Sequence, residues 1–99
     1  MSTSANDIIR PCATSVEITE NTINVELNDG RSLSVPLSWY PRLEHASIEE
    51  RNEWELIGSG HGIHWPKIDE DISIEALISG KASNESQDSL DKWLNSRSV

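Results

Sequence analysis

The densest group of side chains that could bind a metal or a small ligand lies between residues 61 and 71 of this 99-residue chain. It consists of His61, His64, Asp69, Glu70 and Asp71. A His-x-x-His pair followed by carboxylates can hold zinc or another divalent ion. Residues 61 and 64 differ by three, however, and in an extended segment they point to opposite faces. His61, His64, Asp69 and Asp71 are therefore weak candidates for a metal or small-ligand site, and we expect no cofactor.

Two further motifs could indicate an enzyme. The glycine-rich run Gly58-Ser59-Gly60-His61-Gly62 lacks the lysine of a phosphate-binding loop, and no serine stands in a Gly-x-Ser-x-Gly elbow. Cys12 is the only cysteine, so no intramolecular disulfide can form, and no histidine is near it in sequence to activate the thiol. We expect a tight turn at the glycines and a protein that is not an enzyme.

The net charge of the chain limits the classes of partner that it is expected to bind. Eight Lys and Arg against 17 Asp and Glu give a formal net charge of −9. Nucleic acids and anionic membranes attract lysine and arginine, so we expect no direct nucleic-acid or membrane contact. The first twenty residues show no signal-peptide pattern, and no stretch approaches the roughly 20 apolar residues of a spanning helix. We therefore expect a cytoplasmic protein with a basic partner.

Alternating apolar residues predict strands in the first half of the chain. The alternating sets are Val16 and Ile18; Ile23, Val25 and Leu27; and Leu33, Val35 and Leu37. They predict a three-stranded antiparallel meander with one buried face. Asp29-Gly30 favours a type I′ turn between the last two strands. Pro36 lacks an N–H group, so it should end the third strand or lie at an edge.

Two short helices are predicted after the meander. Ser38 could cap the first one, with Pro41 in the first turn, where a missing N–H group costs little. Ser47 followed three residues later by Glu50 matches a capping box, which begins a second helix through about residue 53. Two further short strands are expected at residues 54–56 and 63–65, the second closed by Pro66.

Ser73 is expected to cap another short helix, which ends at Gly80, and the acidic residues 69–71 to form the entry to that helix. The predicted fold class is α+β: a three-stranded antiparallel meander plus two short strands, packed with two or three short helices, and a C-terminal amphipathic helix. Residues 1–14 are expected to be a flexible lead-in, residues 15–80 the α+β domain, and residues 81–99 a polar tail.

The tail contains the predicted contact to a partner. Leu90, Trp93 and Leu94 follow at helical spacing, so this helix either docks on its own domain or binds another protein. With no Phe in the chain, the other three Trp are expected to fill the core, whereas Trp93 is an interface candidate. Arg42 and Arg51 stand in otherwise acidic helices, where they either pair with carboxylates or bind a partner. The predicted partner-binding residues are Leu90, Trp93, Leu94, Arg42 and Arg51.

Several strings in the chain are similar to a known family. They are Val35-Pro-Leu-Ser-Trp-Tyr-Pro-Arg-Leu43, Ala46-Ser-Ile-Glu-Glu-Arg51, Gly58-Ser-Gly-His-Gly-Ile-His-Trp-Pro66, Ile68-Asp-Glu-Asp-Ile72 and Leu77-Ile-Ser-Gly80. Over about residues 13–80 the chain resembles small bacterial proteins grouped as domain of unknown function 2442, DUF2442. This resemblance implies a compact α+β domain with no established enzymatic activity and no catalytic residue to transfer.

The resemblance also bears on function. Some members look like fusions to a helix-turn-helix, or are encoded beside a second small protein in an arrangement similar to toxin–antitoxin pairs. The 19 residues after Gly80 are too few for a helix-turn-helix, which argues against direct DNA binding here.

Our leading hypothesis is a non-enzymatic binding domain, antitoxin-like or regulatory, whose acidic surface steers a basic, toxin-like partner while the tail anchors it. The alternatives are a metal- or small-ligand-binding protein and a transcription-linked regulator acting through a DNA-binding partner. A homo-oligomer is compatible with the sequence.

Overall fold

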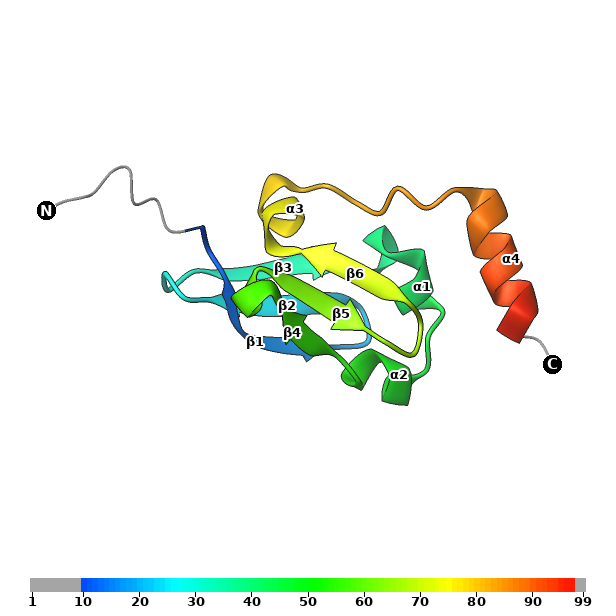
Figure 1. Ribbon diagram of the computed structural model, residues 1–99, viewed down its shortest axis with the longest axis horizontal. Coiled ribbons are helices and arrows are strands. Elements are labelled where there is room, and N and C mark those ends of the chain that lie inside the picture. Colours follow the sequence, from blue (N-terminus) through cyan, green and yellow to red (C-terminus); the bar gives the residue numbers. More distant parts are fainter. Residues whose placement is uncertain (1–9, 98–99) are drawn as a thin grey trace, which may run out of the picture.

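The computed structural model describes residues 10–97, which form two three-stranded antiparallel sheets, short helices and a longer C-terminal helix (Figure 1). The strands are β1 (Ala13–Ile18), β2 (Thr22–Leu27), β3 (Ser32–Pro36), β4 (Glu55–Ile57), β5 (Gly62–Trp65) and β6 (Glu70–Ser73). The helices are α1 (Pro41–Glu44), α2 (Ile48–Asn52), α3 (Ile74–Ser79) and α4 (Gln87–Arg97), with 3-10 turns at Leu37–Trp39 and Gly58–Gly60. The predicted α+β fold class is confirmed. The predicted lead-in lies partly outside the described residues, which begin at Arg10.

The first sheet is the predicted meander, in the order β1-β2-β3, and Pro36 ends β3 as expected. Alternate residues of β2 are buried, because one face of the sheet covers the core. The turn after β2 differs from the prediction of a type I′ turn. Only Gly30 has a positive φ there, and its N–H donates to the Leu27 carbonyl at 3.2 Å. The turn is therefore of the kind in which a left-handed glycine follows an ordinary turn.

The first predicted helix begins later than expected. Ser38 lies in the 3-10 turn, and Tyr40, with φ −128 and ψ 88, is the N-cap of α1. A proline disfavours the helical conformation in the residue before it, so a helix starting at Ser38 could not continue through Tyr40. The prediction of Ser38 as N-cap is wrong, whereas Pro41 does occupy the first turn.

The second sheet has the order β4-β5-β6, and its third strand was not predicted. The sequence pattern assigned residues 69–71 to the entry of a helix, which is wrong. In the structure Glu70 lies opposite Trp65 and Ile72 opposite Ile63 across the β5–β6 pair. Asp69, with φ 54, helps to reverse the chain before β6. Ile72 is the one buried residue of β6, so no alternation is visible in the sequence.

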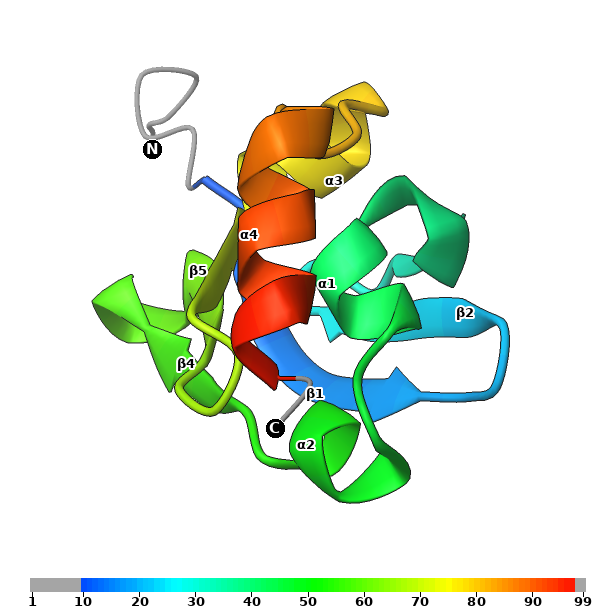
Figure 2. The ribbon, with the colours of Figure 1, turned by 90° about the vertical axis from the view of Figure 1, so that its right-hand side faces the viewer.

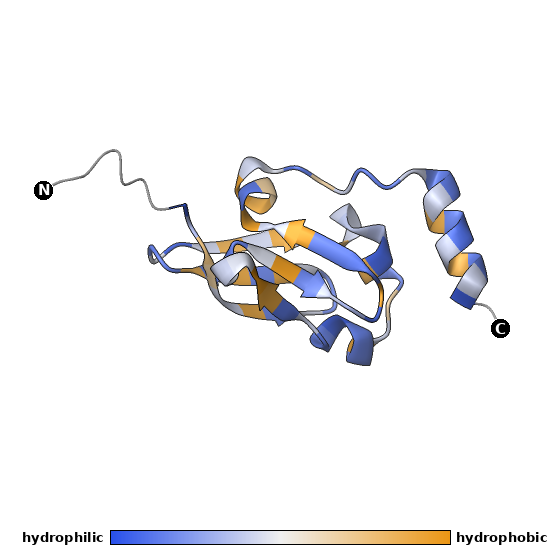
Figure 3. Ribbon diagram, in the orientation of Figure 1, coloured by the Kyte–Doolittle hydropathy of each residue, from blue (hydrophilic) through white to orange (hydrophobic). Residues whose placement is uncertain are grey.

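The two sheets, α1 and α3 share one hydrophobic core, whereas α2 contributes no buried residue. Figure 3 shows the apolar positions along the strands in orange. Trp65 is the largest fully buried side chain, and its indole N–H donates to the Arg51 carbonyl at 3.0 Å. Trp39 and Trp54 are partly buried and pack against the same core. The three tryptophans thus contribute to the core unequally, with Trp65 at its centre.

The predicted capping box at the start of α2 is confirmed. The Ser47 hydroxyl accepts from the Glu50 N–H at 3.1 Å, and the Glu50 carboxylate accepts from the Ser47 N–H at 2.9 Å. These bonds satisfy two backbone donors that a short helix leaves without partners.

Replacing Ser47 by alanine is expected to lower the free energy of unfolding by about 1 kcal/mol, since the N-cap hydroxyl is lost. Chemical denaturation measures the loss. Ser79→Ala, at an exposed serine of α3, is the matched control and should change stability by less than about 0.5 kcal/mol. Equal losses in the two variants would show that the capping box is not stabilising.

The C-terminal part of the chain begins with the expected helix α3, which Ser73 caps and Gly80 ends in a left-handed conformation, φ 74. An extended linker, residues 81–86, then leads to α4 at one end of the molecule, beyond α1 and α2 (Figures 1 and 2). None of the helices between residues 10 and 97 is both long and apolar enough to cross a bilayer.

Candidate functional site

The histidines and aspartates proposed as weak metal ligands do not converge. The Nδ1 atom of His61 contacts the Pro11 carbonyl at 3.1 Å, whereas His64 on β5 pairs with the Asp71 carboxylate on β6. The Asp71 carboxylate raises the pKa of His64. Asp69 contributes its carbonyl to another contact, with Arg42. Residues 10–97 contain no group of three or more His, Cys, Asp or Glu side chains arranged to hold a metal.

Arg51, one of the predicted partner-binding residues, makes contacts within the domain. Its Nε donates to the Leu43 carbonyl at 2.8 Å and one terminal nitrogen donates to the Glu44 carbonyl at 2.7 Å. These carbonyls belong to the end of α1, where the helix itself supplies no partner. The side chain therefore joins α2 to α1.

The predicted tail helix packs against its own domain. In α4 the buried residue is Leu90, which is 8% exposed, while Trp93 and Leu94 are partly buried. The Trp93 ring lies against the core and receives two guanidinium groups, from Arg42 at 5.2 Å and from Arg97 at 4.5 Å. Cation–π contacts of this kind add to the docking of a helix that has little apolar surface of its own.

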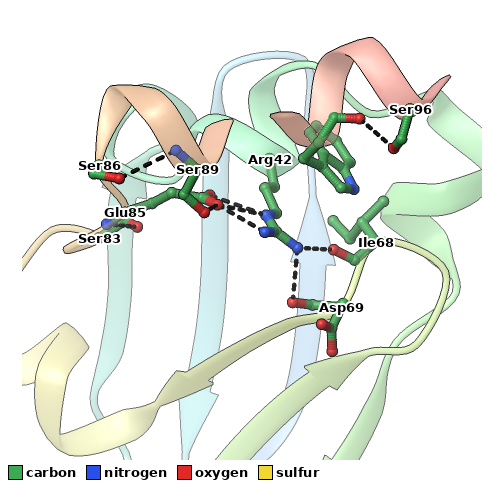
Figure 4. Close-up of polar contacts among 9 residues, drawn as sticks. Arg42, Ile68, Asp69, Ser83, Glu85, Ser86, Ser89 and Ser96 are labelled. Carbon is green, nitrogen blue, oxygen red and sulfur yellow. Dashed lines mark hydrogen bonds and ion pairs between the residues drawn. The ribbon is translucent and has the colours of Figure 1, made fainter. Parts of the chain in front are cut away.

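Arg42 is the centre of the contacts that hold the tail (Figure 4). Its Nε and one terminal nitrogen donate to the Glu85 carboxylate, at 2.9 and 2.7 Å. Its other terminal nitrogen donates to the Ile68 and Asp69 carbonyls, at 3.0 and 3.3 Å. We call Arg42, Glu85, Trp93 and these two carbonyls the Arg42 cluster. It connects α1, the β5–β6 turn, the linker and α4.

A second ion pair fixes the far end of α4. One terminal nitrogen of Arg97 lies 2.6 Å from a Glu50 carboxylate oxygen, and the other lies 3.0 Å from the second oxygen. The guanidinium of Arg97 and the N–H of Ser47 lower the pKa of Glu50 to about 2. The same carboxylate thus serves the capping box of α2 and the docking of α4.

Glu70 is a half-buried carboxylate beside the Arg42 cluster. It faces the core side of the second sheet, opposite Trp65, and lines a cavity of about 370 Å³ beneath the linker. Burial, with the Glu85 carboxylate nearby, raises the pKa of Glu70 to about 7, although Arg42 acts in the opposite direction. Its acidic neighbours in sequence, in contrast, are exposed.

A different surface carries the exposed apolar side chains. Among the described residues, three large apolar side chains are exposed: Ile48 (68%), Leu56 (37%) and Ile57 (40%). All three belong to α2 or β4, and β4 is an edge strand. Beside Ile48 lies a small, mostly apolar hollow of about 140 Å³ between α2 and the end of β1. An exposed apolar group of this kind often marks a contact with another molecule.

Four carboxylates belong to the same elements or to the hollow beside Ile48. Glu20 lines the hollow, Glu49 and Glu53 belong to α2 and its C-cap, and Glu55 lies on β4. None of the four forms an ion pair with another residue in the range 10–97. We call these four carboxylates and the three apolar residues the α2–β4 surface. On β4, Leu56 and Ile57 project to opposite faces of the strand, with Ile57 over Gly62.

Sequence reasoning did not identify the α2–β4 surface, although one signal was available. Ile48 is followed at the helical spacings of three and four by Arg51 and Asn52, so no apolar stripe continues from it. An isolated apolar residue at the start of a capped helix belongs to no apolar helix face, so the sequence indicates that it is exposed.

Comparison with known proteins adds a family and two related structures, none with an assigned activity. The model of the family described as protein of unknown function, DUF2442, matches residues 13–83. A protein of unknown function from Rhodospirillum rubrum ATCC 11170 is 26% identical, with a TM-score of 0.67 over 79% of this chain and 96% of that one. An uncharacterized protein from Chromobacterium violaceum shares the fold at 24% identity, with a TM-score of 0.63 over 89% of this chain and 77% of that one. No curated protein matches the chain in sequence.

Proposed function

This chain belongs to the DUF2442 family, and we propose that it is a small non-enzymatic protein-binding domain whose α2–β4 surface takes a basic segment of another protein. The observation that carries the proposal is that residues 48–57 contain the three exposed large apolar side chains of the described range and three carboxylates that form no ion pair within it, those of Glu49, Glu53 and Glu55.

The chemistry of this surface suits a partner with apolar and basic side chains. Covering Ile48, which is 68% exposed, would remove apolar area from water at the centre of the contact. The carboxylates around it would attract lysine and arginine and repel acidic segments. The net charge of −9 would accelerate the encounter with a basic protein.

The proposed contact lies on the α2–β4 surface and not on the tail. Leu90, Trp93 and Arg42 already contact one another or the domain core, so binding through them would first require α4 to leave. The α2–β4 surface requires no such change. A domain that holds a basic protein in this way would suit an antitoxin-like or regulatory role.

The test uses two 12-residue synthetic peptides, one of alternating Lys and Leu residues and one of alternating Lys and Ser residues. Each is titrated into the full-length ¹⁵N-labelled chain at low salt. The Lys-Leu peptide is expected to shift amide signals of residues 48–57, and Ile48→Ser to weaken its binding about tenfold, the effect of roughly 1.4 kcal/mol. Shifts centred on other residues, or equal binding of the Lys-Ser peptide, would contradict the proposal.

Two glutamates form a matched pair for testing the contribution of carboxylates to binding. Glu49 and Glu75 are both exposed second residues of short helices capped by serine. Glu49→Gln is expected to weaken peptide binding about threefold, the size of an exposed charge contact, and Glu75→Gln to leave it unchanged. Equal effects would show that only the net charge matters and that the α2–β4 surface is not the site.

A further inference from the structure

Polar contacts hold the segment that contains α4 at several points. The linker is attached by the Tyr40 hydroxyl, which donates to the Lys81 carbonyl at 2.9 Å, and by the Ser83 N–H, which donates to the Trp39 carbonyl at 3.0 Å. The Arg42–Glu85 ion pair lies just before the first turn of α4, and the Arg97–Glu50 ion pair lies at its last turn. Ion pairs at both ends of a helix respond to any new charge placed beside them.

Glu70 is the group that can supply such a charge. It lines the cavity beneath the linker, and its side chain takes part in none of the ion pairs or side-chain hydrogen bonds of residues 10–97. Every nitrogen of the neighbouring Arg42 already donates to Glu85 or to a carbonyl. The Glu70 carboxyl is therefore close to the guanidinium without being its partner.

The charges that face Glu70 come from each element around it. Arg42 of α1 and Lys81 of the linker are the cations. Glu85 of the linker, and Asp69 and Asp71 on either side in sequence, are the anions. The phenol of Tyr40 completes the surroundings, and burial together with Glu70 raises the pKa of Tyr40. With more anions than cations around a half-buried carboxyl, the neutral form of Glu70 is the one that fits the docked tail.

We propose that the protonation of Glu70 controls whether the C-terminal segment is docked: once ionised, Glu70 competes with Glu85 for Arg42, and α4 leaves the domain. The direction of this pH dependence follows from the proton affinity of Glu70 in the docked and the undocked state. Docked Glu70 keeps its proton up to about pH 7, whereas a Glu70 exposed by departure of the linker titrates nearer its usual value of 4.5. The contribution of Glu70 to docking is therefore complete below about pH 4.5, is lost as the pH rises from about 4.5 to 7, and stays constant above that range.

This inference connects to the α2–β4 surface and in that respect rests on the proposed function. When α4 leaves, Arg97 no longer neutralises Glu50, which lies on α2 next to Glu49. The surface gains a negative charge. A basic partner is then expected to bind more tightly at pH 8 than at pH 5.5.

The experiment follows the full-length ¹⁵N-labelled chain by NMR from pH 5 to pH 8, with no partner present. Signals of residues 87–97 and of the Trp93 indole are expected to move toward those of a freely mobile helix. The ratio of docked to undocked chain should fall at least tenfold, which corresponds to one unit of pKa difference. Glu70→Gln should abolish the change and remain docked at pH 8, whereas Glu75→Gln should behave like the original chain.

A second measurement needs no variant. In the unsubstituted chain the Glu70 side-chain carboxyl, followed by ¹³C NMR, and the α4 amides are expected to titrate with the same midpoint. Different midpoints, or α4 signals that do not change between pH 5 and 8, would overturn the inference, as would a folded Glu70→Gln variant that keeps the pH dependence. Because the experiment contains no peptide, its outcome is independent of whether the α2–β4 surface binds one.

Discussion

Replacing Trp65 by alanine is expected to lower the free energy of unfolding by about 3–5 kcal/mol, the usual loss for a fully buried Trp. Trp65 is 0% exposed, belongs to the core that both sheets share, and donates its indole N–H to the Arg51 carbonyl. A domain of this size is stable by about 5–15 kcal/mol in total, so the variant should be close to unfolded at moderate temperature. Urea denaturation followed by circular dichroism measures the loss.

Two further variants separate the causes of that loss. Trp65→Phe keeps much of the ring but removes the hydrogen bond and leaves the Arg51 carbonyl without its donor, so about 1–3 kcal/mol should be lost. Trp54→Ala, at a partly buried tryptophan, is expected to cost less than Trp65→Ala because less area returns to water. If Trp54→Ala is as destabilising as Trp65→Ala, the core is not centred on Trp65.

The elements that could be predicted are those whose signal is local. The alternation in β2 and the reciprocal bonds of Ser47 and Glu50 each depend on residues within a few positions of one another. β6 could not be predicted in this way, because its pairing with β5 is a tertiary contact and only Ile72 among its residues is buried. The half-burial of Glu70 follows from the same pairing. The acidic run in which Glu70 stands therefore did not indicate that this side chain is half-buried.

Two isoleucines at equivalent helix positions show the same limit of prediction from local sequence. Ile48 and Ile74 both follow a serine N-cap, yet Ile74 is fully buried and Ile48 is exposed. Ile74 is followed at three and four residues by Leu77 and Ile78, which extend an apolar face. For α4 the apolar stripe is the same whether the helix docks on its own domain or on a partner. Glu85 and Glu50, which Arg42 and Arg97 bind, are distant from them in sequence, so spacing could not decide between the two outcomes.

Arg42→Ala is expected to have the second large effect, a loss of about 3 kcal/mol together with detachment of α4. The side chains of Arg42 and Glu85 are only 16% and 9% exposed, so removing the guanidinium leaves a nearly buried carboxylate and two carbonyls without their donor. Hydrogen exchange should show residues 87–97 losing protection while β2 and β5 keep theirs, and chemical denaturation gives the total loss.

Arg31→Ala is the matched control, because Arg31 and Asp29 form an ion pair whose side chains are 53% and 41% exposed. Exposed pairs contribute little, so this variant should lose less than about 1 kcal/mol and leave α4 protected. The double variant Arg42→Ala/Glu85→Gln should be more stable than Arg42→Ala alone, since it no longer contains an unpaired carboxylate in a nearly buried position. If instead the second substitution adds its own loss, the cost of Arg42→Ala arises from the carbonyls and Trp93, and Glu85 is not the partner through which Glu70 acts.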